Sequence, residues 1–585
     1  MSQPDVKTPT EALRESAFVN PEASEGKNWA SRHARRGYTD YVSKSFPSAP
    51  HAVGTLELEL PCDQQTFASD SVTLPDGSPA LKLDTILMTL YYPARLERGR
   101  SYERLPWMNR PLSATAGGYA DYASLTGYKR ALAIPILMTA AALIRVPAFV
   151  NAPLAEPASA AKHPLVVFSH GMAGSRQMYS QYCGTLAARG FVVAALEHRD
   201  GSGPASAVNG KAPRIVRYLK YDDMPRSTRP AELMGLRHAQ LAMRTAELVA
   251  AVDALRRFGR DPQKSIQDNL RVSGATGFTS GRASGEVADI DTQAWQRVDY
   301  DNVHLSSHSF GGTTVLAALA DSTFAARGIR SATLLDPWLE PLSKTTRPDS
   351  RIPLLAINSP NFTLWRGHFD ELVKIFRPAV RDHPSSALVT VQGITHTTFS
   401  DVAWLAPGRK SGSTGKRSSA DPTAVMGLFV DNTAAFIAGE GHRSNPKAAL
   451  DYENIKAELK KLQPGQSVSH FVQANFRMAS QQNFYELYRR SSLGLSLTDA
   501  LDELIQSGHI NPQLALKVLA KFDKAAALVL ASSLKTKCTV KGHLKTYRLC
   551  DEVWTFILTD ATLKLEGSEV MGPVGKVKIV ACKGA

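Results

Sequence analysis

The stretch of sequence that most constrains the fold is 301–312 (DNVHLSSHSFGG), followed by 313–320 (TTVLAALA). The apolar positions before the serines predict a short strand, and the small apolar residues after the glycines predict a helix. Ser309 lies between them, at the apex of a sharp turn that would hold its hydroxyl clear of a sheet, as in a nucleophile elbow. The usual Gly two residues earlier is Ser307 here, a small residue that still fits a tight turn. A serine before a helix is also typical of a helix cap, so the motif alone supports both interpretations.

Short apolar runs alternate with predicted helices along most of the first 440 residues. A continuous apolar run is typical of a strand that is buried on both faces of a sheet. Helical spacing predicts helices over Met178–Ala188, Leu241–Leu255 and Met426–Ala438. The predicted strands are Thr55–Leu60, Ile86–Tyr92, Leu165–Ser169, Phe191–Leu196, Ala332–Leu335, Leu354–Ile357 and Leu388–Val391. This alternation predicts an α/β fold with a mostly parallel sheet and helices on both faces.

Two further polar residues follow predicted strands at the edge where Ser309 should lie. Asp336 comes directly after Ala332–Leu335, and His396 follows Leu388–Val391 through a short loop. Acyl transfer by serine needs a nucleophile, a base and a carboxylate that orients the base. The chain order Ser, Asp, His is that of α/β-hydrolases. We therefore predict Ser309 as nucleophile, His396 as general base and Asp336 as the orienting acid.

Other histidines and carboxylates fit these roles less well. They lie beyond the elbow helix, within a predicted helix or in a loop before a proline: Asp321, His368, Asp370 and His383. His308 is adjacent to Ser309, so its side chain should point elsewhere. A single His or Asp is more often a hydrogen-bonded loop residue, and only the joint pattern favours catalysis.

The oxyanion of such a reaction needs backbone donors. The N–H of Phe310 follows the nucleophile directly. The second donor should come from a loop after an earlier strand, and Met172, in the turn after Leu165–Ser169, is the candidate. An ordinary tight turn at His170–Gly171 is the alternative. The charged residues at 197–200 (EHRD) also follow a strand, and we expect them to brace the edge of the sheet without a catalytic role.

Composition limits the class of protein. The five cysteines are scattered and form no C-x-x-C pair, which argues against a disulfide framework and a zinc site and favours a reducing compartment. We predict no metal and no cofactor. The net charge of +14 favours anionic partners such as phospholipid surfaces or nucleic acid. The polar first 16 residues do not resemble a secretory signal, so we expect an intracellular protein.

The most hydrophobic run, Ala131–Ile144, is too short to span a membrane and contains Pro135. A buried core helix is the simpler interpretation. A helix at a lipid interface is the alternative.

The chain changes character near Asn483. Ser496 can cap a helix that ends at Gly508, and Asn511–Pro512 can start a second one. Strands follow at 539–540, 554–558 and 577–582. We therefore expect a disordered segment over 1–51, the α/β domain over 52–440, loops at 273–285 and 409–419, and a linker over 441–482. A helical domain over 483–535 and a β domain over 536–585 complete the prediction.

Several blocks of the first domain resemble the platelet-activating-factor acetylhydrolase family, the calcium-independent group VII phospholipases A2. They are PLVVFSHG at 164–171, FVVAALEHRD at 191–200, SHSFGG at 307–312, LDPW at 335–338 and RIPLLAINS at 351–359. The resemblance implies an α/β-hydrolase that removes a short or oxidised sn-2 acyl chain from phospholipids without a metal. It also implies the Ser309, Asp336 and His396 triad and the Met172 and Phe310 amides as oxyanion donors. The run Ala131–Ile144 falls where the family carries a helix that touches lipid. Ser307 and the insertion before the elbow depart from the pattern and leave substrate preference open.

The segment 483–585 resembles the gamma subunit of transcription factor IIA (TFIIA). The matching blocks are YELYRR at 485–490, LDELIQ at 501–506, PQLAL at 512–516, FDK at 522–524, GHLKTYRLCDEVWTF at 542–556 and KVKIVAC at 576–582. The resemblance implies helices that join a four-helix bundle with the large TFIIA subunit. It also implies strands that complete a β-barrel on the TATA-binding protein beside promoter DNA. The segment carries 14 basic and 10 acidic residues, a mild excess that is compatible with nearby DNA.

Two unrelated functions in one chain need an explanation. Met478 lies just before the second resemblance, where a free-standing subunit would begin. We hypothesise that the sequence joins two neighbouring genes, and a bifunctional protein is the alternative. For the first domain the alternative is a general carboxylesterase. For the whole chain it is a transcription component with an inert hydrolase part. We expect the first domain in the cytoplasm and the second in the nucleus.

Overall fold

The chain forms two compact units, 1–476 and 477–585, and each is described by itself. The computed structural model describes residues 46, 50–157, 162–271, 290–383, 385–391, 393–405, 422–439 and 471–472 of the first unit. In the second unit it describes residues 492–507, 509–510, 514–515, 518–519, 522, 538–550, 553–565, 570–571 and 576–582.

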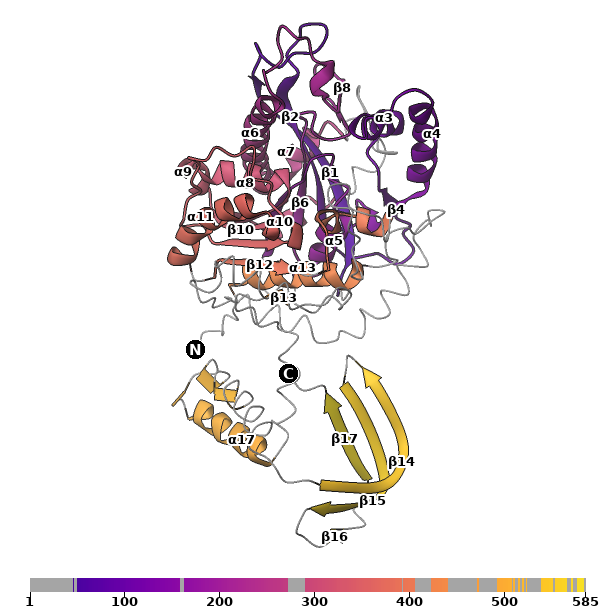
Figure 1. Ribbon diagram of the computed structural model, residues 1–585, viewed down its shortest axis with the longest axis vertical. Helices are drawn as coiled ribbons and strands as arrows, with labels where there is room; N and C mark the ends of the chain where they lie inside the picture. The colour runs from indigo at the N-terminus through magenta and orange to yellow at the C-terminus, as the bar shows by residue number, and fades with distance from the viewer. Residues whose placement is uncertain are drawn as a thin grey trace. The chain divides into compact units, whose positions relative to one another are not determined.

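A single sheet organises the first unit (Figure 1). Its order among the described residues is β13-β12-β11-β10-β9-β5-β6-β2-β1-β4-β3. The central strands from β12 to β6 run parallel, whereas β2 pairs antiparallel with both β6 and β1. The strands are β1 Ala52–Phe67, β2 Leu81–Ala94, β3 Arg104–Pro106, β4 Arg145–Val150, β5 His163–Ser169, β6 Val192–Glu197, β9 Val298–His308, β10 Ile329–Leu335, β11 Leu354–Asn358, β12 Ala387–Val391 and β13 Phe471–Val472.

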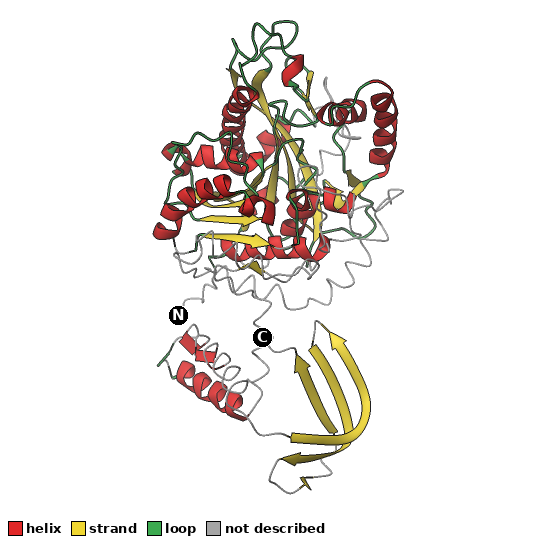
Figure 2. Cartoon of the chain, in the orientation of Figure 1, coloured by secondary structure: helices red, strands yellow, loops and turns green. Residues whose placement is uncertain are grey.

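Helices cover both faces of this sheet (Figure 2). Leu165 and Val167 of β5 belong to the core that also holds side chains of α6, α8 and α11. Phe168 points to the opposite face, where its ring lies 5.5 Å from that of Tyr182 in α5, and Tyr182 bonds Thr433 of α13. The helices are α5 Ser180–Ala187, α6 Leu233–Arg260, α8 Phe310–Leu319, α11 Arg366–Asp382 and α13 Pro422–Ile437. The prediction of a mostly parallel sheet with helices on both faces is confirmed.

The remaining elements of the first unit are short or peripheral. They are α3 Leu112–Tyr122, α4 Gly127–Leu143, α7 Pro262–Gln267, α9 Ser322–Ala325, α10 Pro360–Leu364, α12 Val402–Leu405, the hairpin of β7 Ala205–Val208 and β8 Arg214–Arg217, and the 3-10 turns η1 Tyr221–Asp223, η3 Gln293–Arg297 and η4 His396–Phe399. Each of the predicted strands of the α/β domain overlaps one of the strands of the sheet, and only Phe191, one residue before β6, falls outside its strand. The predicted loops at 273–285 and 409–419, and most of the predicted 1–51 and 441–482 segments, fall outside the described residues.

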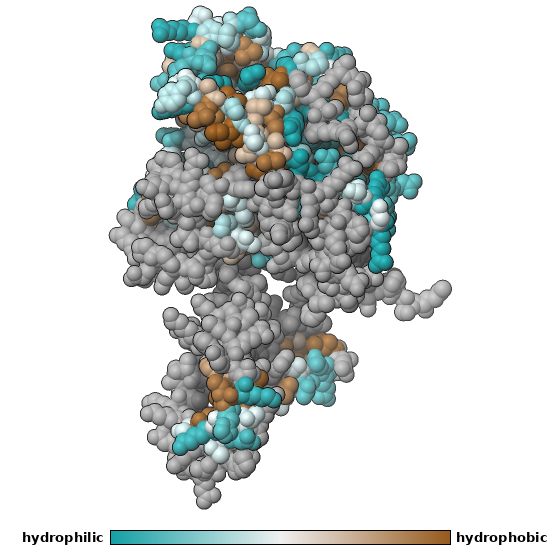
Figure 3. Space-filling model, turned by 90° about the vertical axis from the view of Figure 1, so that its right-hand side faces the viewer, coloured by the Kyte–Doolittle hydropathy of each residue, from teal (hydrophilic) through white to brown (hydrophobic). Residues whose placement is uncertain are grey.

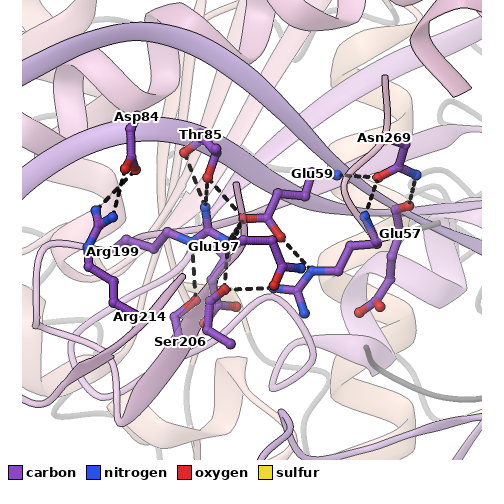
Figure 4. Close-up of polar contacts among 12 residues, drawn as sticks. Glu57, Glu59, Asp84, Thr85, Glu197, Arg199, Ser206, Arg214 and Asn269 are labelled. Atoms are coloured by element: carbon purple, nitrogen blue, oxygen red, sulfur yellow. Dashed lines mark hydrogen bonds and ion pairs between the residues drawn. The ribbon is translucent and has the colours of Figure 1, made fainter. Parts of the chain in front are cut away.

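A buried network of charges ties β1 and β2 to the end of β6 (Figure 4). The Glu59 carboxylate lies 2.6 Å from Arg199 Nη2 and 2.7 Å from Arg271 Nε. Thr85 Oγ1 and the Asn209 N–H also donate to it. Burial opposes ionisation, but the two guanidinium groups lower the pKa of Glu59 below its ordinary value. The residues at 197–200 therefore brace the sheet, as the sequence suggested.

The helix α4 is not the buried core helix that composition favoured. Of its side chains only Ala141 is buried, while Tyr128, Leu132 and Ile136 are 78, 63 and 58% exposed. The apolar character of this run gave no information on which neighbours would cover it. Figure 3 views the side of the molecule that carries α4 and shows apolar residues gathered in its upper part. Within the described residues, every helix is too short or too polar to cross a membrane.

The described residues of the second unit include a long helix and a four-stranded sheet. The helix α17 spans Ser492–Gln506, and β14 Cys538–Cys550, β15 Val553–Leu565, β16 Val570–Met571 and β17 Lys576–Cys582 form the sheet. The predicted cap at Ser496 is wrong, because the helix begins four residues earlier. Gly494 does not stop it, at a cost of about 1 kcal/mol relative to Ala, and the hydroxyl of Thr498 donates to the Gly494 carbonyl. The helix predicted from Asn511 lies largely outside the described residues.

Replacing Glu59 should strongly destabilise the first unit. Glu59→Gln leaves two buried guanidinium groups without their counter-charge, and we expect a loss of about 3–5 kcal/mol of unfolding free energy, measured with urea at pH 7. Because the folded-state pKa lies below 4.5, this contribution is present at neutral pH. It disappears as the pH falls through the folded-state pKa, so the difference between the two proteins should shrink in acid.

The control is Asp370→Asn, which breaks an exposed pair with Arg366. It should change the stability by less than about 1 kcal/mol. Equal effects of the two substitutions would contradict the role given to Glu59.

Candidate active site

Ser309 lies between β9 and α8 in a strained backbone conformation. Its φ is 56° and its ψ is −119°, a region that residues with a side chain rarely adopt. Backbone bonds from its neighbours hold it there: the Ser309 N–H donates to the Leu335 carbonyl at 3.0 Å, and the Trp338 N–H donates to the Ser309 carbonyl at 2.9 Å. The serine is therefore not a simple helix cap, and its side chain makes no cap hydrogen bond.

Small residues around Ser309 are required by close packing. A Cβ at Gly311 would lie 2.1 Å from the carbonyl oxygen of Ser169, and one at Gly312 would lie 2.6 Å from Pro337 Cβ. Ser307 stands where a Gly is usual and is fully buried, and its hydroxyl donates to the Thr333 carbonyl at 3.2 Å. A hydroxyl with a partner fits this turn without distorting the strand pairing of β9 and β10.

Asp336 follows β10 directly and is fully buried. Its backbone also has a positive φ, 42°. Its carboxylate accepts hydrogen bonds of 2.6 Å from both the N–H and the hydroxyl of Ser359, the residue that follows β11. These donors fix the carboxylate plane and leave Oδ2 directed at His396.

His396 begins the turn η4, which follows β12. Its Nδ1 lies 3.1 Å from Asp336 Oδ2, and its Nε2 lies 3.0 Å from Ser309 Oγ. With Nδ1–H donating to the carboxylate, Nε2 is free to accept the serine proton. The structure thus brings together the three side chains that the sequence singled out, and their geometry permits proton transfer from Ser309.

Two rings hold the imidazole of His396 in place. Phe362 stacks on it with centroids 4.5 Å apart and an interplanar angle of 6°. His308 lies at 4.5 Å with an angle of 35°. The side chain of His308 therefore lies against the general base, inside the site, where the sequence had given it no place. The side chain of His396 is nevertheless 27% exposed, so a substrate can reach it from solvent.

The two predicted oxyanion donors lie beside the nucleophile. A Cβ on Gly171 would stand 2.9 Å from Ser309 Cβ, so the turn that carries Met172 touches the serine. The Gly171 N–H donates to the Tyr179 hydroxyl at 3.2 Å. Neither the Met172 nor the Phe310 amide donates a hydrogen bond within the described part of the chain. Their role as oxyanion donors stays a prediction.

A second serine, histidine and carboxylate also form a chain of hydrogen bonds. Ser169 Oγ lies 2.7 Å from His198 Nε2, and His198 Nδ1 lies 2.7 Å from Glu247 Oε2. All three are buried, with exposed fractions of at most 2%. Burial lowers the pKa of His198 well below its ordinary value. Without access for a substrate, this set is a structural brace under the turn that leads to Met172.

The other candidates lie elsewhere. His368 is in α11, where its Nε2 donates to the Pro337 carbonyl, and Asp370 pairs with Arg366 on the surface. Asp321 caps α9. His383 ends α11. In the described ranges no group of three His, Cys, Asp or Glu side chains is placed to hold a metal ion.

Sequence reasoning missed the residues that support the triad. Ser359, Phe362 and Tyr179 each contact a triad residue or its neighbours. Ser359 could have been found, because it follows a predicted strand at the same edge as Asp336. The other two come from a loop helix and from the start of α5, and their sequence positions carry no such signal.

The fold and the geometry around Ser309 define a serine hydrolase of the α/β-hydrolase class. A family described as platelet-activating factor acetylhydrolase, isoform II, matches residues 77–459. Two further families, the helical domain of the transcription initiation factor IIA gamma subunit and the gamma subunit itself, match residues 484–530 and 539–584. The chain therefore belongs to the acetylhydrolase isoform II family, and its C-terminal part belongs to the family of the TFIIA gamma subunit.

Curated relatives match the C-terminal part. Transcription initiation factor IIA subunit 2 of Oryza sativa subsp. indica is 55% identical over 98 residues, which is 17% of this chain and 91% of that protein. The protein of the same name from Schizosaccharomyces pombe is 54% identical over 99 residues, covering 17% and 89%. The one from Saccharomyces cerevisiae is 45% identical over 111 residues, covering 17% and 91%.

Among solved structures, a ferulic acid esterase from Streptomyces cinnamoneus has a TM-score of 0.41 and 18% identity. The match covers 69% of this chain and 92% of that one. A similarity at this level does not establish a shared activity.

Covalent labelling separates the two serine sets. A fluorophosphonate probe reacts with an activated serine, so we expect it to label the wild-type chain and Ser169→Ala but not Ser309→Ala. Loss of a triad serine costs about 10⁶-fold in rate in a comparable enzyme. Intact labelling of Ser309→Ala, read by mass spectrometry, would show that another residue is the nucleophile. The Ser169→Ala variant controls for general disturbance of the sheet edge.

Proposed function

We propose that the first unit hydrolyses the short or oxidised sn-2 acyl ester of phospholipids, as a 1-alkyl-2-acetylglycerophosphocholine esterase does. The observation that carries this proposal is the hydrogen-bonded set of Ser309, His396 and Asp336 on a strained turn. Membership of the acetylhydrolase family supports the choice of ester. No step of the proposed mechanism uses a metal or a cofactor.

The first half of the reaction forms an acyl-enzyme. Nε2 of His396 takes the proton of Ser309 as its oxygen attacks the ester carbonyl carbon. Asp336 stabilises the resulting imidazolium, and the Met172 and Phe310 amides donate to the oxyanion. Each such donor is worth about 10²–10³ in rate. His396 then returns the proton to the departing glycerol oxygen, and the ester bond breaks.

The second half releases the acid. Water loses a proton to His396 Nε2 and attacks the acyl carbonyl carbon, again through an oxyanion. The bond to Ser309 Oγ breaks, and the proton from His396 restores the serine hydroxyl. The stacked ring of Phe362 holds the imidazole in the same place throughout both steps.

A lipid surface is the proposed place of reaction. The apolar side chains of α4 are exposed to water in the free protein. They would be removed from water if the helix lies in the headgroup region of a membrane or micelle. Lys129 on the same helix, together with the net charge of +14, favours an anionic surface. A general carboxylesterase would have no use for this helix, and that difference separates the two alternatives.

For the second unit we propose the role of a TFIIA gamma subunit in assembly of the RNA polymerase II preinitiation complex. Its partners would be the large TFIIA subunit, the TATA-binding protein and promoter DNA. The exposed leucines 493 and 504 lie on the same side of α17 and give this helix an apolar surface for a bundle partner. Among the described residues β14 and β17 each pair with β15 only, which leaves strand edges for another chain to extend.

The proposed locations follow from these functions. The TFIIA-like part would act in the nucleus and the hydrolase part in the cytoplasm, and neither would be secreted. Under the hypothesis that two neighbouring genes are joined here, the two parts exist as separate chains. A single polypeptide near 63.4 kDa, detected with antibodies to both parts, would overturn that hypothesis.

Substrate presentation tests the hydrolase proposal. We expect the full chain to hydrolyse a 2-acetyl phospholipid in vesicles, and Ser309→Ala to be inactive. Leu132→Asp and Ile136→Asp should lower hydrolysis in vesicles about 10-fold or more, because each loses an apolar side chain worth about 1.5–3 kcal/mol on burial. Hydrolysis of a soluble short-chain ester should not change.

Leu233→Asp is the matched control, because Leu233 is an exposed leucine at the start of another helix, α6. It should leave both activities unchanged. Turnover of soluble ester without any turnover of phospholipid would favour a general carboxylesterase. A folded chain with neither activity would favour the inert-hydrolase alternative.

Binding tests the second proposal. The chain should form a complex with a TFIIA large subunit and shift a promoter DNA bound by the TATA-binding protein in a native gel. Leu493→Asp and Leu504→Asp should weaken the complex with the large subunit, because they place charges on the apolar surface of α17. Unchanged binding by both variants would contradict the use of that surface.

A further inference from the structure

A chain of three hydrogen bonds joins the loop of the base to the turn of a predicted oxyanion donor. The Gly171 N–H lies 3.2 Å from the Tyr179 hydroxyl. That hydroxyl lies 2.8 Å from His308 Nδ1. His308 Nε2 lies 3.1 Å from the backbone carbonyl of His396. The two ends belong to loops that follow different strands, β5 and β12.

The chemistry of the groups fixes the direction of each bond. A carbonyl oxygen only accepts, so His308 carries its proton on Nε2. A neutral imidazole then accepts at Nδ1, and the Tyr179 O–H donates to it. The Tyr179 oxygen is left to accept from the Gly171 N–H. All three bonds therefore run in one sense, from Gly171 to His396, and every polar atom in the chain has a partner.

The surroundings keep His308 neutral. The ring is buried, and burial lowers the pKa of His308 well below its ordinary value, with the neighbouring His396 acting in the same direction. A second charge here would oppose the imidazolium that forms on His396 during the reaction. A neutral His308 can instead pack on that ring, 4.5 Å away, opposite Phe362.

We propose that His308 and Tyr179 are positioning residues that hold the general base His396 and the Met172 turn in register with Ser309. This inference rests on the proposed serine mechanism. Because the Gly171 amide is directed at Tyr179, the following amide of Met172 has a fixed orientation beside the serine. Because His308 holds the His396 backbone, the imidazole keeps its distances to Ser309 and Asp336. One relay thus sets both the orientation of the Met172 amide and the position of the His396 imidazole, which the transition state needs at the same time.

The same substitution at two neighbouring tyrosines tests this role. Tyr179→Phe removes the hydroxyl at the centre of the relay. Tyr182→Phe removes a hydroxyl that is also buried, with two partners, Ser306 and Thr433, neither of which belongs to the site. We expect Tyr179→Phe to lower kcat for a soluble ester about 10- to 100-fold with little change in KM. Tyr182→Phe should lose stability without losing kcat.

A double-mutant cycle tests the connection. His308→Phe keeps an aromatic ring on His396 but removes both hydrogen bonds. If the two residues act as one relay, the variant with both substitutions should be about as slow as the slower single variant. If the fold losses in kcat of the two single variants multiply in the double variant, the two residues have independent roles, and the proposal is overturned. Equal kcat for Tyr179→Phe and the wild type would overturn it as well, even if His308→Phe failed to fold.

The rate of fluorophosphonate labelling separates this proposal from the proposed function. It needs the activated serine but no phospholipid. If the wild-type chain is labelled but does not hydrolyse phospholipids, the proposed substrate is wrong, whereas the proposed relay is unaffected. Equal labelling rates for Tyr179→Phe and the wild type would refute the relay and not the substrate.

Discussion

The left-handed backbone of Ser309 is the constraint around which the first unit is built. Neighbouring strand ends hold it through the bonds from Ser309 to Leu335 and from Trp338 to Ser309. The helix that follows can approach the sheet only because Gly311 has no side chain. Strain of this kind persists only when the surroundings over-determine it. The parallel strands supply that support, and they also bring Asp336 and His396 to the same edge.

Buried polar side chains connect this edge to the rest of the sheet. Arg244 donates to the His170 carbonyl and lies over the ring of Phe310, so the turn after β5 and the helix after β9 share one support. Asp401, a few residues after His396, accepts from Trp107 and from the start of α5. Charges and amides that are satisfied in this way hold loops in one arrangement, which hydrophobic packing alone does less well. These contacts therefore tie the loops that carry the site to the helices around the sheet.

The two units differ in how they bury apolar surface. The first has a core between its sheet and its helices and leaves α4 exposed, which suits contact with lipid. In the second, α17 and the strands keep leucines exposed, including Leu544. Exposed apolar side chains of this kind are typical of a surface that binds another chain. The surfaces of the two units thus agree with their families, a hydrolase for the first unit and a transcription factor subunit for the second.

By itself the sequence determined the main strands and helices of the first unit, the strained turn at Ser309 and the choice of Asp336 and His396. Periodicity and the ends of parallel strands are local signals, and these predictions needed nothing more. Only the tertiary structure decided that Ser359 orients the acid, that Tyr179 and His308 link two loops, and that α4 is exposed. These outcomes depend on which distant segments of the chain become neighbours in the fold. The sequence of an apolar run or of a single polar residue is the same whether other segments bury it or leave it exposed to solvent.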